Sequence, residues 1–127
     1  MKMLAGSDAA GAAIWTTPGF SLHQEFRELA ECGLSPLEIL QMTTLNGAEF
    51  LGRQTTMGTV GEEENTNLVL LDANPVEDVT NFDKIAAVFL KGKYFSRDAL
   101  DKMLSDVADA HKQGCTRVAM KVKQRFG

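Results

Sequence analysis

A chain of 127 residues is long enough for one ordinary domain but only about half as long as a complete eight-stranded parallel barrel. Its 44% apolar and 24% charged residues are typical of globular proteins and exclude disordered and fibrous classes. The net charge of −4 is uneven, since residues 112–125 carry +5 and residues 1–111 carry −9, and an acidic body argues against a nucleic-acid partner.

No apolar run reaches the length of a membrane span, and the first residues lack a basic segment followed by an apolar core. We therefore expect a cytoplasmic protein with no membrane partner. Cys32 and Cys115 form neither a CxxC pair nor a disulfide framework, which fits a reducing compartment.

Residues 3–8 read as a short apolar strand that ends in small residues and the carboxylate of Asp8. Parallel barrel enzymes assemble their active sites at the carboxyl ends of such strands, which makes Asp8 a candidate catalytic residue. The alternative is a strand-end acid that caps the following turn.

A loop over residues 9–19 precedes a helix that we expect to begin at Ser21, where Ser21 and Gln24 read as a capping box. Gly33 is expected to end this helix. His23 lies in the first turn of this helix and is a candidate substrate-binding residue, although an exposed helix histidine is the simpler interpretation.

A second helix follows, with Ser35 as N-cap, Pro36 at the first helical position and Glu38 at the third. Asn46-Gly47 is expected to interrupt it, and residues 48–51 to add a short turn.

The pattern then changes to strands, expected over residues 58–60, 67–71, 85–90 and 94–95. Lys91-Gly92 predicts a tight hairpin between the last two strands. Because Leu68 to Leu71 is a continuous apolar run, we expect that strand to be covered on both faces. Residues 79–82 predict one short helical turn.

A last helix is expected from Ser96, with apolar residues on one face and Gly114 as a break. The face comprises Leu100, Met103, Leu104, Val107 and Ala108. The basic tail after it contacts the acidic body, a second subunit or solvent.

Six short motifs, read in order from Met3 to Leu104, resemble the carboxyl-terminal third of metal-dependent amidohydrolases, closest to the imidazolonepropionase-like and prolidase-like branch. The motifs are Ala5-Gly6-Ser7-Asp8-Ala9, His23-Gln24-Glu25-Phe26, Gly33-Leu34-Ser35-Pro36, Thr43-Thr44-Leu45-Asn46-Gly47-Ala48, Gly58-Thr59-Val60, and Leu68 to Pro75. Each is weak alone, but their order and spacing together are specific.

The resemblance implies an α/β fold consisting of the end of a (β/α)8 barrel, part of a small β-sandwich and a C-terminal helix. Residues 1–56 would be the last barrel strand and the helices that follow it. Residues 57–95 would be the carboxyl-terminal part of the composite sandwich, and residues 96–127 the final helix and basic tail.

Asp8 would match the family's aspartate after the final strand, which binds the metal and takes the proton from the metal-bound water. The full-length family uses zinc or another divalent metal, whose ligands are mainly histidines and a lysine or carboxylate after earlier strands. Those ligands have no counterpart here, since the chain has only His23 and His111. We therefore expect Asp8 to ligate a metal only if the other ligands are supplied, and no cofactor in this chain alone.

The resemblance implies a hydrolase of C–N bonds, dipeptidase-like or imidazolonepropionase-like, that is inactive alone. The alternative is a stand-alone structural or interaction module that associates with itself. Helices without their barrel leave apolar faces uncovered, so the expected partners are a second copy in a homodimer or a complementary barrel chain.

Overall fold

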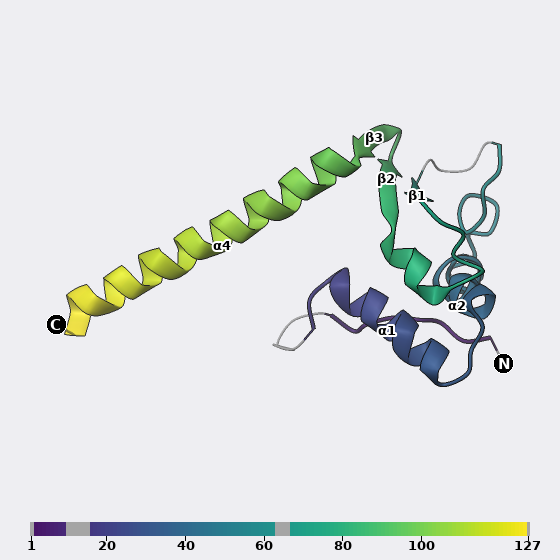
Figure 1. The fold of residues 1–127 in the computed structure, drawn as a ribbon, viewed down its shortest axis with the longest axis horizontal. Coiled ribbons are helices and arrows are strands. Elements are labelled where there is room, and N and C mark those ends of the chain that lie inside the picture. Colours follow the sequence, from purple (N-terminus) through teal and green to yellow (C-terminus); the bar gives the residue numbers. More distant parts are fainter. Residues whose placement is uncertain (1, 10–15, 63–66, 127) are drawn as a thin grey trace. The chain divides into compact units, whose positions relative to one another are not determined.

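The computed structural model describes residues 2–9, 16–62 and 67–126, with side chains described as far as Lys112 (Figure 1). The chain divides into two compact units, Met1–Tyr94 and Phe95–Gly127. The first unit contains helices α1 (Phe20–Glu31), α2 (Pro36–Thr43) and α3 (Leu45–Phe50), the 3-10 helix η1 (Val79–Asp83) and strands β1 (Asn67–Leu71) and β2 (Ile85–Leu90). Strand β3 (Lys93–Ser96) leads into the long helix α4 (Arg97–Phe126).

The strand expected over residues 3–8 is not formed. Residues 2–9 form neither a helix nor a paired strand, and in Figure 1 this segment runs beside α1. A strand is defined by a hydrogen-bonded neighbour, and the backbone groups described here bond to helices instead. The apolar pattern predicted a barrel strand with no sheet partner of its own in this chain, and the described residues supply none.

Helix α1 begins one residue earlier than expected and without a capping box. Its N-cap is Gly19, with φ 85°, and no side chain caps it. Ser21 lies inside the helix, where its hydroxyl donates to the carbonyl oxygen of Thr17 at 2.9 Å. Because Ser21 lies inside the helix and not at its N-cap, its hydroxyl does not cap the helix, and the predicted capping box was wrong.

The capping box of α2 is confirmed. The backbone N–H of Glu38 donates to the Ser35 hydroxyl, and the Ser35 N–H donates to the Glu38 carboxylate at 2.8 Å. The interruption after α2 lies at Thr44, with φ −122° and ψ −84°, rather than at Asn46-Gly47, which falls inside α3.

Residues 58–60 do not form a strand either. Gly58 has φ 103°, and a Cβ at this position would lie 2.6 Å from the Cβ of Ala48. The segment 57–59 is therefore a bend pressed against α3, a conformation and a contact that only glycine accommodates.

The sheet has the order β1-β2-β3. Strands β1 and β2 are antiparallel, with Asn67 opposite Leu90 and a register irregularity between Leu70 and Leu71. The hairpin between β2 and β3 is confirmed: Lys91 and Gly92 both have positive φ, 50° and 77°, as a tight two-residue turn of the mirror-image type requires.

Strand β1 is not covered on both faces as expected. Val69 and Leu70 are 58% and 54% exposed. The run of apolar residues identified the strand, but the described part of the chain contains no second sheet layer to cover it.

The core of the first unit is an aromatic and aliphatic cluster of Phe26 from α1, Ile39 from α2 and Phe82 from η1. The rings of Phe26 and Phe82 lie 5.1 Å apart. Ala5 of the extended segment and Leu71 of β1 pack against this cluster, so the core joins the start of the chain to the helices and the sheet.

Helix α4 spans 30 residues and continues through Gly114, which was expected to break it. A glycine inside a helix costs about 1 kcal/mol relative to alanine, which a long helix tolerates. The side chains of the basic tail from residue 113 lie outside the described residues. Among the helices of the described residues, α4 included, none is long and apolar enough to cross a membrane.

Candidate active-site segment

Residues 2–8 are held against the helices by backbone groups that would otherwise pair with neighbouring strands. The amide nitrogen of Ala5 donates to the carbonyl oxygen of Met42 at 3.4 Å, and that of Gly6 donates to the Glu25 carboxylate at 3.1 Å. The side-chain amide of Asn46 donates to the carbonyl oxygen of Met3 at 2.9 Å. Three helices therefore fix the path that the chain takes to Asp8.

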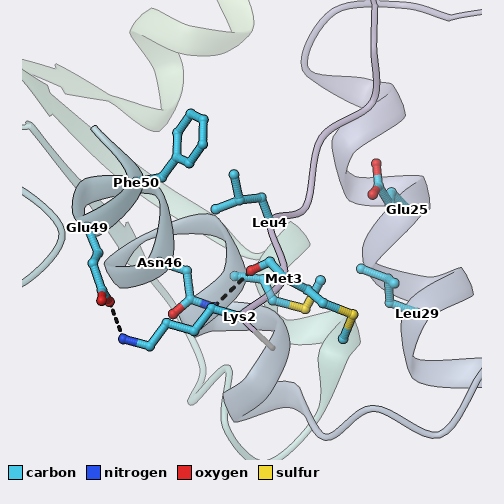
Figure 2. Close-up of a pocket in the computed structure, with 9 residues that line it drawn as sticks. Lys2, Met3, Leu4, Glu25, Leu29, Asn46, Glu49 and Phe50 are labelled. Atoms are coloured by element: carbon cyan, nitrogen blue, oxygen red, sulfur yellow. Dashed lines mark hydrogen bonds and ion pairs between the residues drawn. The ribbon is translucent and has the colours of Figure 1, made fainter. Parts of the chain in front are cut away.

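An open cleft of about 630 Å³ lies along the first part of this segment (Figure 2). Met3 and Leu4 of the segment, with Leu29 of α1 and Phe50 of α3, give it apolar walls. At its polar end Lys2 forms an ion pair with Glu49, beside Asn46. Met3 and Leu4 are 48% and 46% exposed, so this apolar surface is open to a ligand or a second polypeptide.

Asp8 lies at the end of the segment, in a second open cleft of about 530 Å³. The residue is exposed and has φ 46°, the left-handed region that aspartate adopts more readily than most residues. The opposite wall is one face of α1, which presents Ser21, Gln24, Glu25 and Glu28, and the C-cap residue Cys32. Glu25 lines both clefts and thus connects the anchoring of the segment to the surroundings of Asp8.

Among the described residues that line this second cleft, three are carboxylates and none is lysine or arginine. Such a surface can accept protons or contribute oxygen ligands to a cation, but a zinc site needs about three protein ligands held at coordination distance. In residues 2–9, 16–62 and 67–112, no three His, Cys, Asp or Glu side chains are grouped to hold a metal ion. The donors described in this chain therefore do not by themselves fit the metal that the family resemblance implies.

His23 is placed away from Asp8 and does not line either cleft. Its ring packs edge-on against Phe26, with centroids 5.5 Å apart, and its Nδ1 lies 2.9 Å from an oxygen of Asp83 in η1. Although the two atoms are close, Nδ1 makes no hydrogen bond of acceptable geometry. Arg27 forms an ion pair with the same carboxylate, so His23 belongs to a contact between α1 and η1.

A family model described as "Amidohydrolase family" matches residues 1–95, which contain both clefts and Asp8. The chain belongs to the amidohydrolase family. The predicted family is thus confirmed.

Solved structures of amidohydrolases agree with this assignment. An amidohydrolase is 32% identical over 59% of this chain, with a TM-score of 0.54, and phenylurea hydrolase B is 34% identical over 61%, with a TM-score of 0.54. A Xaa-Pro dipeptidase shares the fold over 59% of the chain, with a TM-score of 0.55 and 21% identity. No curated protein matches the chain.

This amidohydrolase chain spans only a small part of the solved relatives, namely 19%, 18% and 17% of the three structures. The mixed α/β fold with a small antiparallel sheet is consistent with a fragment of such a protein. Most of what forms a whole amidohydrolase in those structures thus has no counterpart among these 127 residues.

Two residues that position the segment were not predicted as site residues. Glu25 appeared only within a family motif, and Asn46 was taken as part of a helix break. Both side chains form hydrogen bonds with backbone groups more than fifteen positions away in the sequence. A local sequence pattern does not indicate such long-range hydrogen bonds.

Proposed function

We propose that this chain is the carboxyl-terminal portion of a metal-dependent amidohydrolase, and that the whole enzyme hydrolyses C–N bonds of small peptide-like or cyclic amide substrates. Alone, the chain is catalytically inactive. The observation that carries this proposal is the position of Asp8, at the end of an extended segment anchored to three helices and exposed in an acidic cleft.

Family membership supports the reaction class, and the relatives support the bond type. A Xaa-Pro dipeptidase and a phenylurea hydrolase are both named for substrates with a C–N bond beside a carbonyl. A dipeptidase-like or imidazolonepropionase-like specificity is part of the proposal.

In the whole enzyme Asp8 would be one carboxylate ligand of a divalent metal, zinc in the simplest case, which would supply an activated water, and the Asp8 carboxylate would accept a proton. A carboxylate suits the proton transfer because it is ionised at neutral pH and can pass the proton to the leaving nitrogen. The remaining ligands come from polypeptide outside these 127 residues, because His23 lies against Asp83 and not beside Asp8. His23 as a substrate-binding residue stays a prediction.

The test is reconstitution. The chain is mixed with an amino-terminal fragment of an amidohydrolase relative that ends before its last barrel strand, and dipeptide and phenylurea hydrolysis are measured with zinc and with a chelator. We expect activity only in the mixture with metal. Chelator-sensitive hydrolysis by the pure chain, or stoichiometric zinc bound to it, would contradict the proposed inactivity.

Asp8→Asn tests the assignment of the residue, and Asp72→Asn, in an exposed turn, is the matched control for loss of one negative charge. The Asp8 variant should form the same complex as the parent chain but hydrolyse at least about a hundredfold more slowly, as expected for loss of a general base. Equal hydrolysis rates for the two variants would show that Asp8 takes no part in the reaction.

A further inference from the structure

Helix α4 carries an uncovered apolar stripe. Met103, Leu104 and Val107 are 45%, 50% and 69% exposed, and Leu100 continues the same face one turn earlier. All positions from 101 to 112 are exposed. Helices in proteins gain most of their stability by packing an apolar face against another element. We therefore expect this 30-residue helix to pack against a partner along its length.

The stripe extends in the sequence beyond the described side chains. Leu100, Leu104, Val107 and His111 are spaced by four, three and four residues. The same spacing then repeats from His111 through Cys115 and Val118 to Val122. An 11-residue repeat gives 3.67 residues per turn, close to the 3.6 of a straight helix, so these positions stay on one side over the whole of α4.

The charges of α4 are divided between its halves. Residues 97–111 contain two basic and four acidic residues, a net charge of −2, whereas residues 112–126 contain five basic residues and no acid. The ion pairs of the first half, such as Arg97 with Asp101 at 2.7 Å, are exposed pairs along the helix surface that contribute little to stability. Because the midpoint of α4 falls between His111 and Lys112, the boundary between the two charge types is at its centre.

We propose that the partner of α4 is the α4 of a second copy, packed antiparallel along this stripe. Antiparallel packing places the −2 half of each helix against the +5 half of the other, whereas parallel packing opposes the two basic halves. The helix dipoles also favour the antiparallel arrangement. The family model covers residues 1–95, so this surface lies outside the matched residues and the inference goes beyond the proposed function.

The mass of the full chain in solution tests the proposal, measured by light scattering across a concentration series. The parent chain should have twice the mass of one copy. Val107→Asp should weaken dimerisation about 30-fold or more, as expected for a charge in the centre of an apolar interface. Ser105→Asp adds the same charge two residues away on the opposite face and should leave the mass unchanged. A monomeric parent chain, or equal dissociation constants for the two variants, overturns the proposal.

Orientation is tested with a spin label at a position outside the stripe. A spin label is attached to Asp98→Cys in a background with Cys32→Ser and Cys115→Ser, and the distance between labels in the dimer is measured. Antiparallel packing separates the labels by about 40 Å, from 27 residues at 1.5 Å each. A distance of about 20 Å or less indicates parallel packing and overturns the antiparallel assignment.

Discussion

The side-chain amide of Asn46 donates to the carbonyl oxygen of Met3 at 2.9 Å, across 43 positions of sequence. This bond ties α3 to the extended segment that ends at Asp8. In a complete parallel barrel such a carbonyl would also have a neighbouring strand as a possible partner. In this chain the helices hold the segment in its extended path, so the surroundings of Asp8 depend on α1, α2 and α3.

Replacing Asn46 should therefore loosen the segment. Asn46→Ala removes one hydrogen bond and should lower the free energy of unfolding by about 1 kcal/mol. Gln41→Ala, an exposed amide on α2, is the control and should change it by less than about 0.5 kcal/mol. Urea unfolding followed by circular dichroism measures both, and equal effects would show that the bond does not contribute.

Gly58 should be intolerant of any side chain. Gly58→Ala places a Cβ 2.6 Å from that of Ala48 at a φ of 103°, so α3 must shift and the backbone is strained. We expect the free energy of unfolding to fall by about 2 kcal/mol. Gly47→Ala is the matched control, and it should raise the free energy of unfolding. Nothing lies within 4 Å of its added Cβ, and alanine favours the helix by up to about 1 kcal/mol. A stabilising Gly58→Ala would mean that the bend is not required.

Features fixed by a few neighbouring residues were predicted well from the sequence. Ser35, Pro36 and Glu38 specify the start of α2 because each cap bond spans three residues, and Lys91-Gly92 specifies the hairpin because Gly92 adopts positive φ without steric cost. Such interactions need no knowledge of the remaining chain.

Features that depend on distant contacts were predicted poorly. Residues 3–8 have the composition of a strand, but pairing depends on neighbours that the described residues do not supply. The exposure of Val69 has the same origin, since an apolar run does not reveal whether a second layer covers it. Asp8 could be selected as a candidate from its place after an apolar run, whereas Glu25 and Asn46 required the fold itself.

The capping box of α2 should make stability depend on pH. Hydrogen bonds from the Ser35 side chain and backbone hold the pKa of Glu38 below its usual value of 4.5. A carboxyl with a lowered pKa in the folded state stabilises the fold above its unfolded pKa and loses this contribution as the pH falls through the folded pKa. The stabilisation from Glu38 should therefore be complete near neutral pH and disappear progressively below pH 4.5.

Glu38→Gln tests this dependence, because glutamine can retain the hydrogen bonds of the box but does not ionise in this range. The parent chain should have the higher urea midpoint at pH 7, and the two midpoints should converge in strongly acidic solution. Glu31→Gln, on the exposed last turn of α1, is the control for loss of a negative charge. A difference between the parent chain and Glu38→Gln that is constant from pH 7 to pH 3 would contradict the assignment.

The ion pair between Arg27 and Asp83 should couple α1 to η1 only weakly. The side chains are 52% and 35% exposed, so water screens their attraction, and exposed pairs contribute at most about 1 kcal/mol. A double-mutant cycle with Arg27→Ala and Asp83→Ala should give a coupling free energy below about 1 kcal/mol that decreases in 1 M salt. The same cycle with Asp72→Ala in place of Asp83→Ala should give no coupling. A coupling well above this bound would mean that the pair is shielded from water in solution, and that η1 depends on α1 for more than the packing of Phe26 on Phe82.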